Sequence, residues 1–288
     1  MRTVRWILTV GMFLLCASSV LAQPQRPDFS RLIEAMEKDG CVAHEESGVR
    51  VCKRDYTVDG KNVEAISFEP KGSGRSPGLL LIPGHATTAR DWIPNGLTYA
   101  RNGFAGLAVS QPGYGRSEGP ADYVGPRTLK VLTEGFRRLQ REPFVDAKRM
   151  GVVGYSRGGM AASLLAVRMD DLKAAVLGGG VYDFKRQYDE VTIEGIRQNM
   201  KAETGMTEEA IKLRSSVLQM EKLKCPVLIL HGEKDANVPV SQALLLRDRL
   251  AELKKEFEIQ IFPDRDHAIG PANLYKYSLD FLKRKLSS

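Results

Sequence analysis

A serine between glycines is the residue whose type and surroundings most clearly allow chemistry. Residues 152–160 read Val-Val-Gly-Tyr-Ser-Arg-Gly-Gly-Met, which places Ser156 in a Gly-x-Ser-x-Gly core between an apolar run and a helical pattern. The pattern is typical of a nucleophile elbow, a tight strand-to-helix turn that holds a serine oxygen above the end of a parallel sheet. Gly154 and Gly158 suit such a turn because side chains there would collide with neighbouring segments. An ordinary strand–helix turn is the alternative interpretation, so catalytic partners are needed.

A serine hydroxyl is a weak nucleophile near neutral pH, so it needs an adjacent base, and the base needs an orienting group. For an elbow of this kind the expected chain order is serine, acid, histidine. Asp235 lies in the polar loop after the apolar run 227–230. His267 lies in the loop after the run 257–262, just before the last helical pattern. Both residues therefore lie at predicted strand ends, where an acid and a base are expected.

Other residues compete for these two roles. Among the four histidines, His44 lies in no motif, and His231 ends an apolar strand, which favours a packed strand-end residue. The competing acids are Glu233, Asp264 and Asp266. Asp235 fits the motif register best, whereas Asp264 and Asp266 are interpreted as turn residues.

The elements that must position these residues alternate along the chain. Short continuous apolar runs occur at 78–82, 104–109, 150–154, 174–177, 227–230 and 257–262. Continuous apolar runs favour strands that are buried on both faces, as in a parallel sheet covered by helices. Helical patterns separate them, for example Leu129, Leu132 and Phe136. We predict an α/β fold with right-handed crossovers and one doubly wound, mostly parallel sheet of about eight strands.

Two further regions complete the organisation. At the N-terminal side, Ser30 is expected to cap a short helix that ends at Gly40, and a hairpin is expected around the turn dipeptide Asp59-Gly60. Residues 182–223 are polar, helical in pattern and without a strand. We expect them to form a cap or excursion between the sixth and seventh strands and to contribute substrate contacts. A plain surface insertion is the alternative.

With these motifs, the chain resembles an α/β-hydrolase. It is similar to the branch that includes dienelactone-hydrolase-like, acetyl-esterase-like and prolyl-oligopeptidase-type catalytic domains. The resemblance runs from about residue 62 to the C-terminus and includes Val-Asp-Ala-Lys-Arg-Met-Gly at 145–151 and Gln-Pro-Gly-Tyr-Gly-Arg-Ser at 111–117. It implies Ser156 as nucleophile, Asp235 as acid and His267 as general base, with no cofactor.

The loop Pro83-Gly84-His85-Ala86 resembles the family's oxyanion loop. The resemblance implies that the backbone N–H groups of His85 and Arg157 bind the developing anion. Many relatives carry His-Gly where Pro83-Gly84 stands here, and the His85 imidazole is a further candidate for substrate contact. Four aromatic residues are candidates for lining the substrate pocket, with ordinary packing as the alternative: Trp92, Tyr114, Tyr123 and Tyr182.

The function expected from these features is that of an exported serine hydrolase that cleaves an ester or similar acyl bond of a small-molecule or peptide substrate. A peptidase of the prolyl-oligopeptidase type is the alternative, although the chain leaves no room for the large N-terminal domain of those peptidases. Dienelactone hydrolases usually carry a cysteine nucleophile where this chain has Ser156. A non-catalytic binding protein with the hydrolase fold is the remaining alternative.

Composition and charge agree with a folded enzyme. The 288 residues are 43% hydrophobic and 27% charged, which suits a large α/β domain. The net charge of +7 falls to +5 when Arg2 and Arg5 are removed with the N-terminal segment. The densest basic clusters, Arg137-Arg138 and 283–285, lie in amphipathic contexts without interleaved aromatics. They predict solvated helix faces rather than a nucleic-acid site.

Residues 1–22 are expected to be a secretory signal peptide, with an apolar core at 6–16 and small residues before a cut at Gln23. The apolar run is too short to span a bilayer comfortably, and an uncleaved anchor is the alternative. Residues 23–288 then form a single α/β-hydrolase domain. In an oxidising compartment Cys41 and Cys52 are able to pair, whereas Cys225 opens an apolar strand. The cysteine spacing does not match a zinc site, so we expect no metal.

Overall fold

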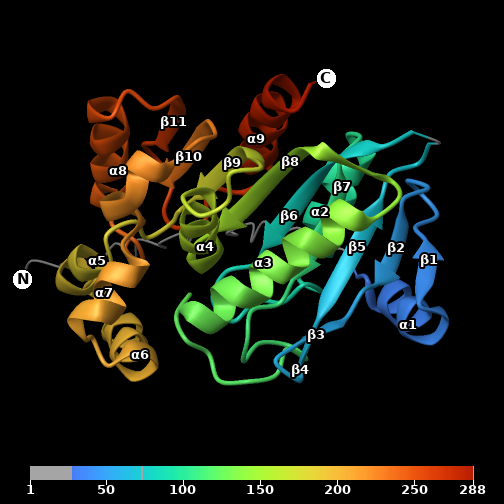
Figure 1. The fold of residues 1–288 in the computed structure, drawn as a ribbon, viewed down its shortest axis with the longest axis horizontal. Helices are drawn as coiled ribbons and strands as arrows, with labels where there is room; N and C mark the ends of the chain where they lie inside the picture. Colours follow the sequence, from blue (N-terminus) through green and yellow to red (C-terminus); the bar gives the residue numbers. More distant parts are fainter. Residues whose placement is uncertain (1–27, 73, 288) are drawn as a thin grey trace, which may run out of the picture.

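The computed structural model describes residues 28–72 and 74–287, so the predicted signal peptide at 1–22 lies outside the described residues. A nine-stranded mixed sheet forms the centre of the fold, in the order β1-β2-β5-β7-β6-β8-β9-β10-β11 (Figure 1). The pairs from β7 through β11 are parallel, whereas β1, β2 and β5 join antiparallel at one edge. The predicted mostly parallel sheet flanked by helices is confirmed.

The strands of the sheet are β1 (Cys41–Ala43), β2 (Arg50–Lys53), β5 (Ala65–Glu69), β6 (Ser76–Ile82), β7 (Ala105–Val109), β8 (Val145–Tyr155), β9 (Leu172–Gly178), β10 (Val227–Gly232) and β11 (Phe257–Phe262). All six predicted apolar runs are strands. The sheet has one strand more than predicted, since the three-residue β1 carries no apolar run that would mark it.

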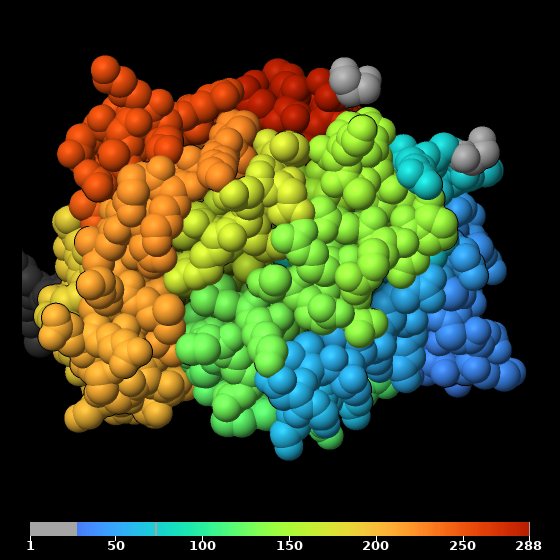
Figure 2. Space-filling view, viewed as in Figure 1, coloured from blue at the N-terminus to red at the C-terminus, as the bar shows by residue number. Residues whose placement is uncertain are grey.

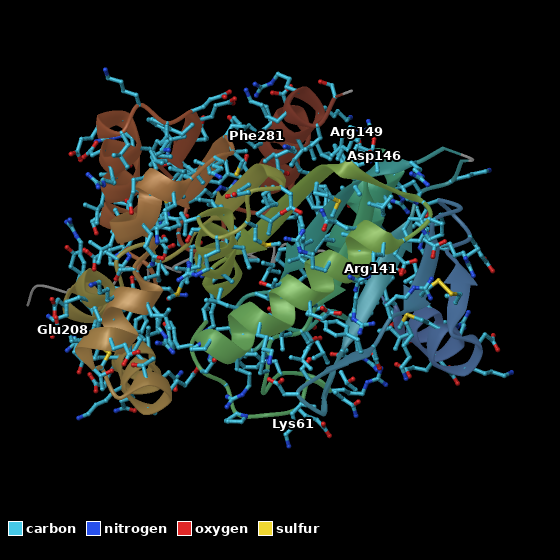
Figure 3. All side chains as sticks on the ribbon, viewed as in Figure 1. Lys61, Arg141, Asp146, Arg149, Glu208 and Phe281 are labelled. Carbon is cyan, nitrogen blue, oxygen red and sulfur yellow. A yellow bond between two sulfur atoms is a disulfide. The ribbon has the colours of Figure 1, made fainter. Side chains whose placement is uncertain are left out.

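Helices cover both faces of the sheet. They are α1 (Ser30–Asp39), α2 (Ile93–Arg101), α3 (Pro126–Arg141), α4 (Arg157–Ala166), α8 (Ser241–Glu252) and α9 (Pro271–Lys285). Alternate strand residues face opposite layers. Leu80 packs in the core formed with α3, α4 and α8, whereas Leu79 packs with α1, α2 and α9. Phe281 points inward from α9, and Lys61 lies at the periphery (Figure 3).

The predicted excursion is helical and lies between β9 and β10. It contains α5 (Phe184–Glu190), α6 (Glu194–Thr204), α7 (Glu208–Arg214) and the 3₁₀ helix η1 (Ser216–Lys222). In the space-filling view it abuts the loop before α3 (Figure 2). Arg214 makes this contact, because its guanidinium donates to the carbonyl oxygens of Tyr123 (2.9 Å) and Asp122 (2.6 Å). No helix of the described ranges has the length and apolar character needed to cross a membrane.

The N-terminal elements follow the prediction with two corrections. Helix α1 ends at Asp39 with Gly40 as its C-cap, as predicted, but Ser30 is its first residue rather than its N-cap. The Ser30 N–H donates to Asp28 Oδ1 at 2.9 Å. Asp59 and Gly60 both have positive φ (51° and 73°), as a tight hairpin turn requires. That turn joins β3 (Tyr56–Val58) to β4 (Lys61–Val63), which form a separate two-stranded sheet, whereas β2 pairs with β5 in the main sheet.

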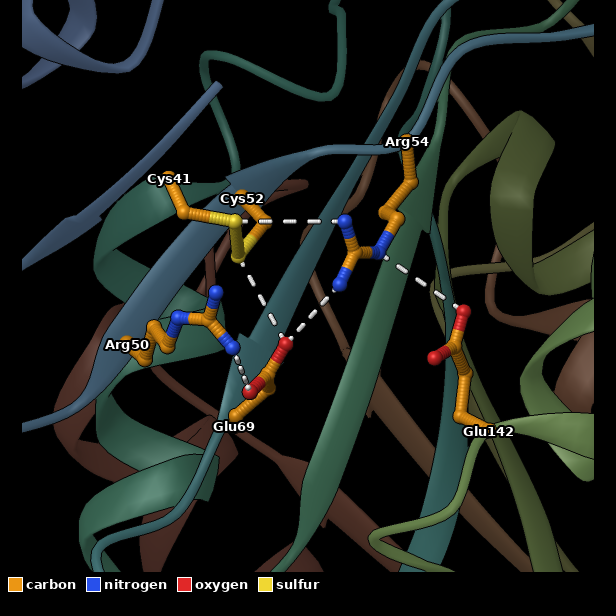
Figure 4. Close-up of a disulfide and its surroundings, with 6 residues drawn as sticks. All are labelled: Cys41, Arg50, Cys52, Arg54, Glu69 and Glu142. Atoms are coloured by element: carbon orange, nitrogen blue, oxygen red, sulfur yellow. Dashed lines mark hydrogen bonds and ion pairs between the residues drawn. A yellow bond between two sulfur atoms is a disulfide. The ribbon is translucent and has the colours of Figure 1, made fainter. Parts of the chain in front are cut away.

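A disulfide between Cys41 and Cys52 links the edge strand β1 to β2, where the two residues are directly opposed (Figure 4). Beside it, Glu69 on β5 accepts from Arg50 Nη1 and from Arg54 Nη2, each at 3.1 Å (Figure 4). Cys225 is free and buried. The edge of the sheet is thus fixed by one covalent bond and two ion pairs.

Replacing Cys41 and Cys52 together by serine should lower the free energy of unfolding by about 3 kcal/mol, because the disulfide closes a loop of sequence separation 11. Urea unfolding of the oxidised wild type and of the double variant measures the difference. Reductant should destabilise only the wild type. An equal effect of reductant on both proteins contradicts the assignment.

Candidate active site

Ser156 lies at the junction of β8 and α4 in an unusual backbone conformation. Its φ of 57° and ψ of −124° belong to a left-handed region that non-glycine residues rarely adopt. The Ser156 N–H donates to the carbonyl oxygen of Gly178 at the end of β9, at 2.7 Å. Every residue of α4 is buried. The strained serine is therefore held between a central strand and a fully packed helix, as the elbow motif predicts.

The glycines around Ser156 are required by the close approach of three backbones. A Cβ atom on Gly154 would overlap the carbonyl of Gly158, and a Cβ on Gly158 would overlap the carbonyl of Ile82 at the end of β6. Both contacts are with main-chain atoms, which cannot rotate away. The turn therefore requires glycine at positions 154 and 158, because any larger residue would overlap main-chain atoms.

The structure brings together the three residues that the sequence motifs single out. His267 Nε2 is 2.9 Å from Ser156 Oγ, and His267 Nδ1 is 2.7 Å from Asp235 Oδ2. Asp235 accepts only, so the hydrogen on Nδ1 points to it and Nε2 is left to accept from the serine hydroxyl. The Asp235 side chain is 1% exposed and that of His267 is 22% exposed. A buried acid thus orients a base that reaches solvent.

Asp235 is held by more than His267. Its Oδ1 accepts the N–H groups of Asn237 and Val238, each at 2.9 Å. His231 Nε2 is 2.8 Å from the Val238 carbonyl oxygen and 3.4 Å from Asp235 Oδ2. Burial alone raises the pKa of Asp235, but hydrogen bonds from His231 and His267 outweigh it and lower the pKa to about 2. His231 is buried at the strand end, as expected, but its contact with the acid was not foreseen.

Tyr155 contacts His267 in two ways. Its hydroxyl donates to the His267 carbonyl oxygen at 2.5 Å. The two rings pack edge to face, with their centroids 5.8 Å apart. Burial raises the pKa of Tyr155 to about 12, so the hydroxyl keeps its proton. The sequence offered one signal for this role, namely its place directly before Ser156.

The competing acids lie elsewhere. Asp266 Oδ1 accepts the N–H of Ala268 at 2.8 Å, which is the turn geometry predicted for it. Asp264 is exposed and lies 3.7 Å from the Lys234 ammonium. Glu233 is exposed as well. The acid in contact with His267 is therefore Asp235.

The predicted oxyanion loop lies against Ser156. A Cβ atom on Gly84 would be 3.2 Å from the Ser156 Cβ. The next residue, His85, lines the cavity, and its Nδ1 is 2.8 Å from the Tyr114 hydroxyl. Arg157 is the first residue of α4, where backbone N–H groups have no partner within the helix. The loop and the helix start thus place two backbone segments beside the serine.

A cavity of about 250 Å³ opens at Ser156 and His267. Its apolar lining is Val181, Ile193, Ile196 and Val238. The amide side chains that line it are Gln187, Asn199 and Asn237. Helices α5 and α6 supply part of this wall, so the excursion contributes to the pocket and is not a plain surface insertion.

The four candidate aromatic residues divide among different roles. Tyr123 lines the cavity. Tyr114 bonds to His85 and also accepts from Arg157 Nη1 at 2.7 Å. Trp92 and Tyr182 are buried in the two hydrophobic cores and do not line the pocket. Aromatic type alone does not separate pocket from core, because both environments bury apolar surface.

Replacing Gly158 by alanine should lower the free energy of unfolding by about 1–3 kcal/mol and reduce activity, because the new Cβ meets the Ile82 carbonyl. Gly195→Ala is the matched control, since a Cβ there meets nothing within 4 Å and alanine favours helix α6. Urea unfolding of both variants checks the contrast. Equal effects at the two positions count against the steric account.

Asp235 should make stability depend on pH. Its folded-state pKa of about 2 lies below the ordinary value of 3.8, so the carboxylate stabilises the folded protein above pH 3.8. That contribution, about 2 kcal/mol, is lost as the pH falls through about 2. The stability difference between wild type and Asp235→Asn should shrink over this range in urea unfolding. Asp264→Asn, in an exposed neighbouring loop, is the control and should show a difference that stays constant.

Comparisons with known proteins show the family of this chain. The profile of the Prolyl oligopeptidase family matches residues 123–288. The chain is 30% identical over 229 residues to "Uncharacterized peptidase YtmA" of Bacillus subtilis (strain 168), covering 77% of this chain and 88% of that protein. It is 28% identical to "Uncharacterized peptidase YuxL" of the same organism, over 74% of this chain and 35% of that protein. The chain thus spans nearly all of one relative and about a third of the other.

Solved structures show the same fold at low identity. An acylaminoacyl peptidase of Pyrococcus horikoshii superposes with a TM-score of 0.73 at 19% identity, over 83% of this chain and 42% of that chain. An acetyl xylan esterase of Paenibacillus sp. R4 superposes with a TM-score of 0.74 at 17% identity, over 89% of this chain and 93% of that chain. The protein has the α/β-hydrolase fold and is a serine hydrolase that belongs to the prolyl oligopeptidase family.

Proposed function

We propose that this protein hydrolyses ester or similar acyl bonds through an acyl-enzyme on Ser156, with His267 as general base and Asp235 as its orienting acid. The observation that carries the proposal is the continuous contact from Ser156 Oγ to His267 (2.9 Å) and from His267 to Asp235 (2.7 Å). These contacts have the lengths of hydrogen bonds, which a proton transfer between positioned groups requires.

In the first half of the reaction, His267 Nε2 takes the hydroxyl proton as Ser156 Oγ attacks the substrate carbonyl carbon. The carbonyl π electrons move to oxygen, and the backbone N–H groups of His85 and Arg157 donate to the resulting oxyanion. Asp235 stabilises the imidazolium that forms. Its low pKa keeps Asp235 ionised near neutral pH.

In the second half, the tetrahedral intermediate collapses and the bond to the leaving group breaks. His267 gives its proton to the leaving alcohol or amine. Water then attacks the acyl-enzyme, with His267 again accepting the proton, and the acid product leaves with Ser156 regenerated.

The size of the cavity supports a small acyl group. About 250 Å³ lies below the range of roughly 300–1,000 Å³ typical of pockets for drug-sized ligands. A peptidase is the second candidate, favoured by the family match and by the relatives named as peptidases. Both activities share the acyl-enzyme chemistry and differ in the leaving group.

We also propose that the protein is exported. The residues that carry this proposal are the basic and apolar segment at 1–22. The Cys41–Cys52 disulfide supports it, because such bonds persist in oxidising compartments.

Ser156→Ala and His267→Ala should each lower kcat for p-nitrophenyl acetate by about 10³-fold or more. Each substitution removes one residue of the proposed triad, whose three residues act together. His44→Ala is the matched histidine control. It lies at the far edge of the sheet, beside Ser47, and should keep wild-type rates. Wild-type rates in Ser156→Ala contradict the assignment of Ser156 as the nucleophile.

A substrate panel separates the two candidate activities. We expect p-nitrophenyl esters of short acids to exceed long-chain esters, acetylated sugars and aminoacyl naphthylamides in kcat/KM. Purified protein from residue 23 onward is the sample. Higher kcat/KM for aminoacyl naphthylamides would replace the esterase proposal by the peptidase one.

A further inference from the structure

Arg157, which follows the nucleophile and lines the cavity, forms a buried ion pair with Glu203 of the excursion. We infer that the Arg157–Glu203 pair sets the acyl specificity of the site by making it select electrically neutral acyl groups. The inference rests on the proposed function and goes beyond it, because it assigns a substrate class and the residues that enforce it.

The charge of Arg157 is paired within the protein, and its one atom without a hydrogen-bond partner among the described residues, Nε, is buried out of reach of solvent. Its side chain is 4% exposed, and its Nη1 and Nη2 reach both Glu203 oxygens at 2.9–3.1 Å. The guanidinium also lies 3.9 Å above the Tyr123 ring, and its Nη1 donates to Tyr114. Glu203 in turn accepts the Tyr123 N–H at 2.7 Å. This cation therefore has little interaction left to offer a ligand.

The remaining lining of the cavity is neutral. Among the described lining residues, Arg157 carries the one permanent charge, and the others are apolar, amide, hydroxyl, phenol or imidazole groups. Burial and the Arg157 charge lower the pKa of His85, so its imidazole is neutral at pH 8. An acyl group with a carboxylate meets a guanidinium that is already neutralised. An acyl group with an ammonium meets no lining carboxylate in this part of the chain.

A charged acyl group that enters the cavity would therefore lose part of its hydration without gaining a partner, which is costly. A neutral acyl group carries no such cost and is free to contact Val181, Ile196 and Val238. Glu203→Gln removes the negative charge of the pair. The Arg157 guanidinium then lies unpaired beside Ser156 and becomes a receptor for a carboxylate.

The test compares three p-nitrophenyl esters of similar length at pH 8: the hexanoate, the monoester of adipic acid and the 6-aminohexanoate. In the wild type, kcat/KM for the hexanoate should exceed that for either charged ester by roughly tenfold or more. In Glu203→Gln, the ratio of adipate to hexanoate should rise by roughly tenfold or more. In the double variant Arg157→Gln/Glu203→Gln, which removes both charges, the ratio should return toward the wild-type value.

Asp189→Asn is the matched control, because Asp189 forms an exposed i,i+4 pair with Lys185 on α5 of the same excursion. Its ratios should equal those of the wild type. Wild-type rates that are equal for the neutral and charged esters would overturn the inference. So would a Glu203→Gln variant that loses activity equally on all three esters, because a purely structural pair predicts that result.

Two further measurements complete the test. If Glu203→Gln does not fold, the wild-type ratios at low and high salt still decide, since a pocket effect persists at high salt whereas surface steering is screened. If the wild type and Ser156→Ala hydrolyse the hexanoate at the same rate, the proposed function fails. That outcome differs from an active enzyme that accepts charged acyl groups, which overturns only the specificity.

Discussion

The strained backbone of Ser156 is the constraint on which the site depends. A serine at a φ of 57° persists only where the surrounding structure forces it. Here β8 lies at the centre of the sheet between β6 and β9, and the ends of all three strands crowd the turn. Gly154 and Gly158 permit the crowding, and the Gly178 carbonyl accepts the serine N–H. The result is an oxygen presented at a fixed place above the sheet.

The order of the strands supplies the other groups at the same edge. β6 leads into the loop of Gly84 and His85, β10 into the loop of Asp235, and β11 into the loop of His267. Because these strands are parallel, their carboxyl ends lie together although the residues are far apart in sequence. The acid is buried and given four donors, so it remains charged, while the base stays partly exposed to receive substrate and water.

Much of this could be predicted from the sequence because the signals are local. Continuous apolar runs marked the buried strands, and the polar loops after two of them marked Asp235 and His267. The contacts that escaped prediction join distant segments. Arg157 and Glu203 are 46 positions apart, and nothing in the local pattern of either residue indicates the other. The family resemblance implied a backbone role for Arg157, whereas its side chain also lines the pocket.

Trapping the acyl-enzyme tests the central claim most directly. The protein is mixed with p-nitrophenyl acetate, quenched with acid within the burst phase, digested and analysed by mass spectrometry. The account predicts an acetyl group on the peptide that contains Ser156, and no acetyl group on that peptide in the His267→Ala variant. Turnover of the ester with the acetyl group on a different residue, or equal acetylation of Ser156 with and without His267, would contradict it.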